Sequence, residues 1–318
     1  MKPLCVIPRI VITTLAALVS FAAPAAAQRP LKSVGLTVGD LGNPFFVQVA
    51  KGAEAKAREL GGAGVKFSAL SANYDLNLQT NHIEDFIAAK VDLIVLGAAD
   101  TKGIAPAVKK ARAAGIIVIA VDVAAEGGVS ATVMSDNLQA GRLAAEFVAQ
   151  KLGGKGQVVI INGPPVSAVM DRVAGAEEVF RRHPGIKVLS RDQNAGGNRM
   201  GGMNVMTDLL TAYPELDAVF AINDPTGLGA ALAIRQARRD NVFVVGVDGA
   251  PDAERALRDP KGAFLATSAQ DPFAMAGKAL EVGFELLQGR KPAQDPLLVS
   301  VSLVTRDNIA KYRGWSSQ

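Results

Sequence analysis

The sequence has 318 residues, and its 34 lysines and arginines against 30 aspartates and glutamates give a formal net charge of +4. Lys2 and Arg9 lie in an N-terminal segment that we expect to be removed, which leaves 34 − 2 = 32 basic and 30 acidic residues, or +2. No basic run is longer than an arginine pair, so the chain lacks the charge pattern that contacts a phosphate backbone, and nucleic acid is excluded as a partner.

The first thirty residues have the composition of a secretory signal. A basic start is followed by an uncharged apolar run, Ile10 to Ala23, and by three small residues, Ala25 to Ala27. The run has about fourteen residues, short of the roughly twenty that cross a bilayer as a helix. We therefore expect residues 1–27 to be a cleaved signal peptide and the remainder to be an exported, soluble protein. Cys5 would leave with the signal, which excludes thiol and redox chemistry.

After Pro30, short apolar runs rich in β-branched residues alternate with longer amphipathic segments. The predicted strands begin at Val34, Val65, Asp92, Ile116, Gln157, Lys187, Ala218, Val242 and Phe264. The predicted helices span residues 45–60, 76–89, 102–114, 138–152, 169–183, 199–212, 228–239 and 272–288. This alternation is typical of strand–helix–strand units, and the continuous apolar runs indicate parallel sheets that are buried on both faces.

The alternation fails once, over residues 122–136, where one strand leads to the next through a glycine turn without a helix. We interpret this break as the passage from a first α/β lobe to a second, and residues 268–272 as a later return. The predicted lobes are residues 28–134 with about 271–298, and residues 135–270 with 299–318. Repeated crossing implies a hinge of several strands, which limits the motion to opening and closing.

Polar side chains recur at the carboxyl ends of the predicted strands, where open α/β sheets bind their ligands. They belong to Asp40, Asp122, Asn223, Asp224, Asp248 and Gln270. Carboxylate and amide oxygens accept directed hydrogen bonds, as neighbouring hydroxyl groups require. Each residue alone could equally be a turn former or a helix cap, so their joint occurrence carries the argument for a site.

The stretch "GDLGNPFF", from Gly39 to Phe46, places two phenylalanines directly behind a turn. Asn43 before Pro44 has the form of a helix N-cap with proline in the first helical position. Phe45 and Phe46 would lie about 100° apart around the helix axis, so one can join the core while the other overhangs the mouth of the sheet. An aromatic face at that place would pack against the C–H side of a sugar ring.

Several stretches together resemble the ribose-type periplasmic sugar-binding proteins, the substrate-binding components of ABC importers. They are "NPFF" from Asn43, "VIAVD" ending at Asp122, residues 202–224, "VVGVDGAPD" from Val244 and "LATSAQ" ending at Gln270. The resemblance implies two Rossmann-like lobes with parallel sheets joined by a three-strand hinge, the type I periplasmic binding protein fold. It further implies one bound monosaccharide or polyol, a periplasmic location, and ligand contacts at Asn43, Phe45, Phe46, Asp122, Asn223, Asp248 and Gln270.

The chain also departs from the family pattern, and we expect the departures to decide which ligand fits. Gly39, Gly97 and Gly197 stand where ribose binders carry serine, asparagine and phenylalanine, while Val123 and Met170 replace two arginines. These positions, with Asp40 and Arg172 beside them, are the predicted specificity positions. Ribose itself is therefore not the expected ligand.

Without these two arginines, the carboxylates of Asp122 and Asp248 would be buried unpaired, which is costly. Either Arg172, Arg199 or Lys102 pairs with these carboxylates, or the ligand brings more hydrogen-bond donors, as a polyol or an amino sugar would. The hypothesis is a pocket larger and more acidic than the ribose type.

Other classes of protein find little support in the sequence. His82 and His183 are far apart, each on a helix pattern without an acid or cysteine at metal-ligand spacing, so we expect surface or helix-end roles, no metal and no cofactor. Asp122 and Asp248 could flank a glycosidic bond, yet the same pair binds hydroxyls without reaction, so no enzyme is expected. A repressor of the lactose type shares the fold, but its DNA-reading N-terminus is replaced here by an export signal.

The resemblance implies a monomer that delivers its ligand to the permease subunits of an ABC importer. Two alternatives stay open: presentation of the closed form to a chemoreceptor or sensor kinase, and binding of a non-carbohydrate ligand.

Overall fold

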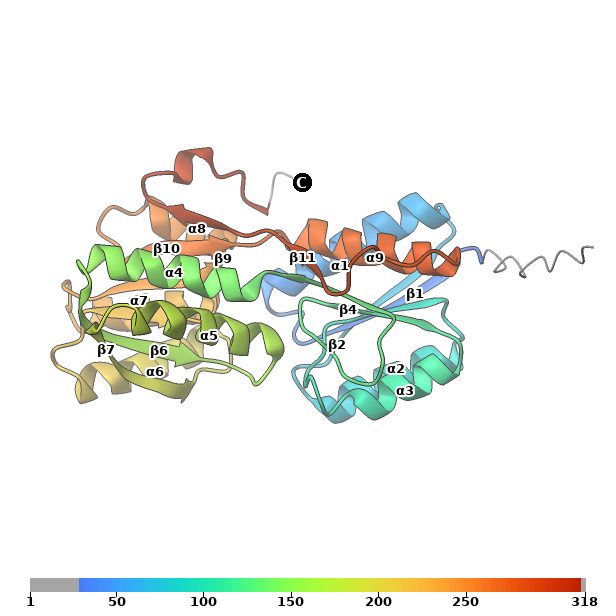
Figure 1. Cartoon of the computed structure of the whole chain (residues 1–318), viewed down its shortest axis with the longest axis horizontal. Helices are drawn as coiled ribbons and strands as arrows, with labels where there is room; N and C mark the ends of the chain where they lie inside the picture. The colour runs from blue at the N-terminus through green and yellow to red at the C-terminus, as the bar shows by residue number, and fades with distance from the viewer. Residues whose placement is uncertain (1–28, 316–318) are drawn as a thin grey trace, which may run out of the picture.

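A computed structural model of the chain describes residues 29–315 and consists of two α/β lobes that lie side by side along its longest axis (Figure 1). The signal peptide predicted over residues 1–27 lies outside the described residues. Between residues 29 and 315, no helix has the length and apolar character needed to span a membrane.

The first lobe is built on a six-stranded sheet in which every neighbouring pair is parallel. In spatial order its strands are β2 (Lys66–Ser71), β1 (Ser33–Val38), β3 (Leu93–Leu96), β4 (Ile117–Val121), β5 (Ala131–Ser135) and β11 (Leu297–Val299). One face is covered by α1 (Pro44–Gly61) and α9 (Pro272–Leu287), the other by α2 (Leu76–Ala88) and α3 (Ala105–Ala113) (Figure 1).

The second lobe repeats this plan, except that its last strand is antiparallel. In spatial order the strands are β7 (Gly185–Asn194), β6 (Lys155–Asn162), β8 (Ala218–Ala221), β9 (Phe243–Asp248), β10 (Phe264–Ala269) and β12 (Ser302–Thr305). One face carries α4 (Asn137–Lys151) and α5 (Ser167–Arg181), and the other carries α6 (Arg199–Ala212), α7 (Asp224–Gln236) and α8 (Pro251–Arg258). A short 3-10 helix, Ile309–Lys311, follows β12.

The central strands are apolar throughout because both of their faces are buried. On β6, Val158 and Ile160 pack toward α4 and α5, whereas Val159 and Ile161 pack toward α6 and α7. All four are fully buried. Since side chains alternate across a strand, a sheet covered on both sides needs this continuous apolar run, and the prediction of parallel, doubly covered sheets is confirmed.

The chain passes between the lobes three times, from β5 to α4, from β10 to α9 and from β11 to β12 (Figure 1). The passage from β5 to α4 lies at the end of residues 122–136, and the passage from β10 to α9 lies within residues 268–272. The predicted lobe boundaries stay a prediction. β5 runs to Ser135 and β11 to Val299, so each of these two strands extends one residue beyond the predicted boundary of the first lobe.

Two local predictions are wrong, and α8, β11 and β12 were not predicted. α7 begins at Asp224, four residues before the predicted start, because the Asn223 side chain caps it by accepting a hydrogen bond from the Thr226 N–H at 3.0 Å. α8 was not predicted, since only Ala253 and Leu257 of its eight residues are buried. His82 is buried rather than exposed, with Nδ1 at 3.1 Å from the Thr37 hydroxyl of β1.

Candidate functional site

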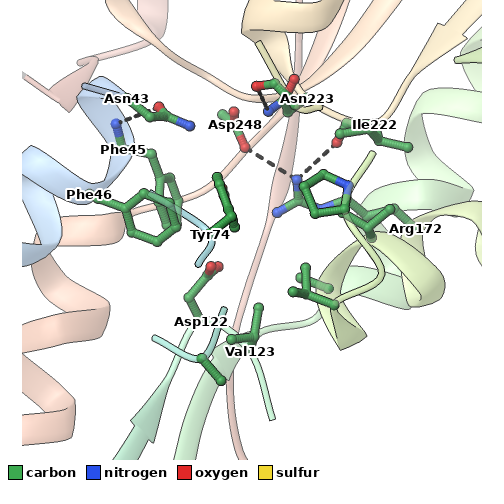
Figure 2. Close-up of a pocket in the computed structure, with 16 residues that line it drawn as sticks. Asn43, Phe45, Phe46, Tyr74, Asp122, Val123, Arg172, Ile222, Asn223 and Asp248 are labelled. Atoms are coloured by element: carbon green, nitrogen blue, oxygen red, sulfur yellow. Dashed lines mark hydrogen bonds and ion pairs between the residues drawn. The ribbon is translucent and has the colours of Figure 1, made fainter. Parts of the chain in front are cut away.

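The carboxyl ends of the two sheets face each other, and an inner pocket lies between them (Figure 2). The first lobe contributes Asn43, Phe45, Phe46, Tyr74, Ala98, Asp122 and Val123 to its lining. The second lobe contributes Pro164, Val166, Ala168, Val169, Arg172, Gly197, Ile222, Asn223 and Asp248. Six of the seven predicted ligand contacts therefore line one pocket. The seventh, Gln270, lies behind it and donates to Asp248.

The start of α1 forms an aromatic wall of this pocket. The Asn43 side chain caps the helix by accepting from the Phe45 N–H at 3.0 Å, and Pro44 is the first helical residue. The rings of Phe45 and Phe46 meet edge to face, with centroids 5.4 Å apart, and both are at least 94% buried. The expected division into one core and one pocket phenylalanine is wrong, since both rings pack in the core and both line the pocket.

Tyr74 was not predicted to take part in the site, although it completes the aromatic wall. It follows β2 with a φ of +56°, and its ring centroid lies 6.4 Å from that of Phe46. A Cβ atom placed on Gly39 would lie 2.6 Å from the Tyr74 ring, so Gly39 makes room for this tyrosine rather than for a ligand. The only sequence signal was an aromatic residue inside the polar run "SANYD" at the carboxyl end of a strand.

The Tyr74 phenol stays neutral and able to donate a hydrogen bond. Burial holds the pKa of Tyr74 well above its usual value, and the carboxylates of Asp122, Asp40 and Asp248 add to the rise. A hydroxyl donor thus stands among carboxylates at the first-lobe side of the pocket.

Asp122 is the polar group in this pocket that most clearly lacks a partner. It follows β4 with a φ of +68° and is 5% exposed, and its buried Oδ1 atom accepts no hydrogen bond. Burial raises the pKa of Asp122 to about 7 against the lowering effect of Arg172, and Asp248 adds to the rise. A buried acceptor without a donor is costly, so this atom is suited to a ligand hydroxyl.

Asp248, at the end of β9, is held by a network within the second lobe. Its Oδ1 accepts from Gln270 Nε2 at 2.8 Å and pairs with Arg172 Nη1 at 3.4 Å. The same Arg172 nitrogen donates to the Ile222 carbonyl at 2.9 Å (Figure 2), and Nε donates to Asn137 Oδ1 at 2.9 Å. Burial raises the pKa of Asp248 to about 6, and Arg172 is the main group that opposes the rise.

The Asn223 and Asp224 side chains make most of their hydrogen bonds within the protein. The Asn223 amide donates to the Gly197 carbonyl at 2.8 Å while its oxygen caps α7, which leaves one amide N–H to offer a ligand. Asp224 is fully buried and accepts from the Thr267 hydroxyl and the Ala250 N–H, so it supports the loop after β9 instead of facing the pocket. The Oε1 atom of Gln270 is buried without a partner.

The predicted specificity positions divide into two groups. Val123, Arg172 and Gly197 line the inner pocket, and Asp40 lies at its outer edge. Gly39 packs under Tyr74, and the Gly97 carbonyl accepts from Gln79, so neither reaches the pocket. The prediction for Met170 is wrong: its side chain is 51% exposed because Val169 and Arg172, rather than Met170, occupy the inward face of α5.

The hypothesis of a pocket larger and more acidic than the ribose type stays a prediction, and the structure shows where the three candidate cations lie. Of the three cations proposed to offset the carboxylates, Arg172 pairs with Asp248, Arg199 pairs with Asp252 at 2.5 Å near the surface, and Lys102 is exposed. Arg172 thus offsets the charge of one of the two carboxylates, and Tyr74 takes up space on the first-lobe side. The remaining imbalance is one carboxylate, that of Asp122.

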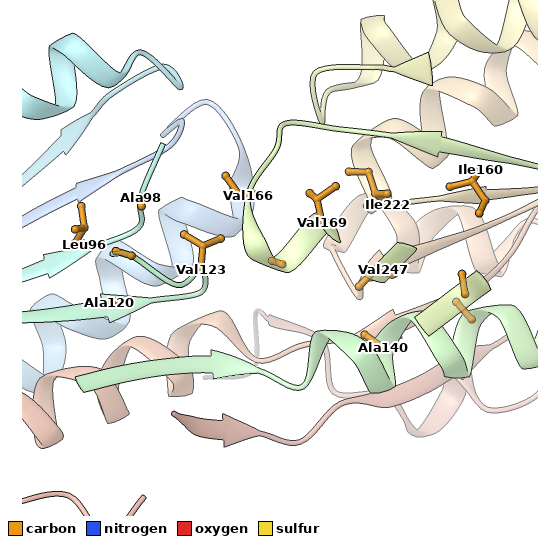
Figure 3. Close-up of a cluster of buried hydrophobic side chains, with 14 of the residues drawn as sticks. Leu96, Ala98, Ala120, Val123, Ala140, Ile160, Val166, Val169, Ile222 and Val247 are labelled. Atoms are coloured by element: carbon orange, nitrogen blue, oxygen red, sulfur yellow. The ribbon is translucent and has the colours of Figure 1, made fainter. Parts of the chain in front are cut away.

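The two lobes also touch beside the pocket. Val123 of the first lobe faces Val166 of the second within one apolar cluster (Figure 3). Next to them, the Ser167 hydroxyl accepts from the Ala124 N–H at 2.7 Å, and the Ser167 N–H donates to the Thr101 hydroxyl at 3.3 Å. These contacts stabilise the arrangement in which both lobes line one pocket.

Replacing Ser167 with alanine should weaken ligand binding although Ser167 does not line the pocket. The change removes an interlobe hydrogen bond of about 0.5 to 1.5 kcal/mol, so the apparent Kd should rise by about 2- to 10-fold as the closed form becomes rarer. Calorimetric titration measures this, with Ser190→Ala on the distant strand β7 as the matched control. Equal affinities of the two variants would show that this contact does not contribute to closure.

Comparison with known proteins places these features in context. A periplasmic binding protein domain model matches residues 34–291. The ribose import binding protein of Bacillus subtilis is 37% identical over 261 residues, covering 81% of this chain and 83% of that protein. The xylitol-binding protein of Mycolicibacterium smegmatis is 32% identical over 287 residues, covering 89% and 80%. A solute binding protein of an ABC transporter from Bacillus halodurans, solved with bound myo-inositol, has a TM-score of 0.81 at 26% identity, covering 91% of this chain and 99% of that one.

Proposed function

The chain belongs to the periplasmic binding protein family and has its type I fold, and we propose that it captures a neutral monosaccharide or polyol between its lobes for an ABC importer. The relatives described above bind ribose, xylitol and myo-inositol, all of them small polyhydroxy compounds. The protein acts in this proposal as a monomer in the periplasm, after cleavage at Ala27, and the permease recognises its closed form.

The observation that carries the proposal is the unpartnered carboxylate oxygen of Asp122 beside an aromatic wall. Phe45, Phe46 and Tyr74 offer apolar ring surface, while Asp122 Oδ1 and the remaining N–H of Asn223 offer hydrogen bonds. A sugar or polyol has the matching combination of C–H faces and hydroxyl groups. Ligand hydroxyls that donate to Asp122 would satisfy the buried oxygen and bridge the first lobe to the second.

Ribose fits this pocket less well than a differently substituted polyol. Val123 and Val166 meet where the family resemblance implies an arginine donor, so that edge of the pocket is apolar. Arg172 is already engaged by Asp248, Asn137 and Ile222, and it offers little beyond its remaining N–H groups.

Catalysis does not form part of the proposed function. Glycoside hydrolysis needs two carboxyl groups free to act on one bond, whereas Asp248 is held by Gln270 and Arg172. Over the described residues, no group of three or more histidines, cysteines or acids could hold a metal ion.

The proposed moving bodies are the lobe predicted over residues 28–134 with about 271–298, extended by the structure to Ser135 and Val299, and the lobe formed by the remaining residues up to 318. A bound ligand shifts the two lobes toward the closed form because it contacts both of them. A receptor domain could recognise the same closed form. Deleting the gene distinguishes the two roles: it abolishes uptake if the protein serves an importer, and only the response to the sugar if it serves a receptor.

Thermal unfolding against a panel of pentoses, hexoses, amino sugars and polyols tests the proposal. A ligand at 100 times its Kd should raise the free energy of unfolding by about 2.7 kcal/mol and the melting temperature by several degrees. A marked shift with one class would support the function and identify the ligand. If the whole panel leaves the melting temperature unchanged, the ligand is not a carbohydrate of these classes.

A further inference from the structure

Beyond Tyr74, the space between the lobes continues into a second, outer pocket. The first lobe lines it with Asp40, Gly42, Asn43, Pro44, Asn73 and Tyr74, and the second lobe lines it with residues 196–199 and with residues of α7 and α8. Asn43, Tyr74 and Gly197 line both pockets, so the two spaces adjoin at these three residues.

Gly197 is the residue of the second lobe that lines both pockets, and it has no side chain. Gly197 has a φ of +68°, which disfavours any side chain, and the Asn223 amide holds its carbonyl at 2.8 Å. A Cβ atom at this position would lie 3.4 Å from the Asn223 amide nitrogen and 3.5 Å from Pro164, both of which line the inner pocket. A large side chain at position 197 would therefore extend toward the junction, and glycine leaves it open.

The lining of the outer pocket combines apolar rings with hydrogen-bonding side chains. Pro44, Pro225 and Pro251, each near the start of a helix, present ring surface, and Leu228 adds to it. The Asn73 and Asn198 amides and the Asp40 carboxylate supply polar atoms among them.

The charges of the outer pocket argue against an anionic occupant. Arg199 is the cation in the lining, and it already pairs with Asp252 at 2.5 Å. With two carboxylates, Asp40 and Asp252, against this one cation, the lining has a net charge of −1. A phosphate or carboxylate group would therefore meet no available cation. Hydroxyl groups and C–H faces suit this lining.

We propose that the natural ligand is a glycoside or disaccharide, with one ring in the inner pocket and a second neutral sugar or polyol unit in the outer pocket. The inference rests on the proposed function, because the inner pocket must hold the first ring. Since both lobes line the outer pocket, the second unit adds contacts to each of them and further favours closure.

The test compares monosaccharides with disaccharides built from them, using D-xylose with xylobiose, D-glucose with cellobiose, and myo-inositol with galactinol. Calorimetry on the whole protein should give at least one pair in which the larger compound binds about 10-fold tighter than the smaller. The variant Leu228→Trp fills the outer pocket and should remove this gain while it leaves monosaccharide affinity within about 2-fold.

Leu232→Trp is the matched control, because Leu232 lies one turn further along α7, is half-buried like Leu228 and does not line the outer pocket. The inference is overturned if monosaccharides bind and no disaccharide binds tighter than its own monosaccharide. It is equally overturned if Leu228→Trp and Leu232→Trp give the same disaccharide affinity. Failure of every sugar and disaccharide to bind would instead overturn the proposed function, and this inference with it.

Discussion

Replacing Asp122 with alanine should weaken carbohydrate binding by about 150- to 25,000-fold, because two ligand hydrogen bonds to a carboxylate contribute about 3 to 6 kcal/mol in total. The side chain is buried in the inner pocket, and its Oδ1 atom has no donor in the protein. Calorimetric titration with the best ligand of the panel measures the loss. Asp208→Ala, at an exposed position on α6, is the control and should bind like the wild type.

Replacing Asp122 should not unfold the protein, so loss of binding can be separated from loss of the fold. Without ligand, Asp122 is a buried carboxyl group whose pKa is raised to about 7, so the ionised form destabilises the folded state. Asp122→Asn should therefore be at least as stable as the wild type at pH 8. Its advantage should shrink toward pH 5, where the wild-type carboxyl group is protonated in the folded state.

Binding should also depend on pH through this group. Ligand hydroxyls that donate to the carboxylate lower its pKa, so binding releases a proton and the affinity should rise between pH 5 and pH 8. The expected change is up to about 10-fold per pH unit below 7, and Asp122→Asn should remove most of it. Affinity within a few-fold of the wild type in Asp122→Ala, together with the same pH profile, would show that the ligand lies elsewhere.

Replacing Arg172 with methionine should lower the free energy of unfolding by about 3 to 5 kcal/mol, the cost of leaving one partner of a buried ion pair alone. The Arg172 and Asp248 side chains are 6% and 4% exposed, and Arg172 also donates to Asn137 and Ile222. Chemical denaturation measures the effect. Arg142→Met is the matched control in the same lobe, since its pair with Glu178 lies at the surface, is screened by solvent and should contribute little to stability.

The loss in Arg172→Met should itself depend on pH. Arg172 opposes the rise in the pKa of Asp248, so its removal raises this pKa further above about 6. At pH 5 the carboxyl group is then protonated and uncharged, and the destabilisation should be smaller than at pH 8. Equal losses in Arg172→Met and Arg142→Met at pH 8 would contradict the structural role assigned to this pair.

The fold and most of the site were predictable from the sequence for a physical reason. Strands buried on both faces must be continuously apolar, which makes them visible, and their carboxyl ends then locate polar residues such as Asp122 and Asp248. Asn43 and Pro44 gave the start of α1 because capping is a local interaction.

The parts that failed depend on contacts between distant segments. Tyr74 enters the site through a turn with positive φ and through the space left by Gly39, and neither feature can be read from its neighbours. Arg172 faces inward while Met170 does not because packing against the second sheet fixes the rotation of α5. His82, on α2, is buried for a similar reason, since its partner Thr37 comes from the distant strand β1.

A crystal structure of the protein with the sugar or polyol that gives the largest thermal shift tests the central claim most directly. We expect one ring or chain of the ligand between the aromatic wall and the second lobe, with a ligand hydroxyl within hydrogen-bonding distance of Asp122 Oδ1. A ligand bound outside the inner pocket, or inside it with Asp122 Oδ1 still lacking a donor, would contradict the account.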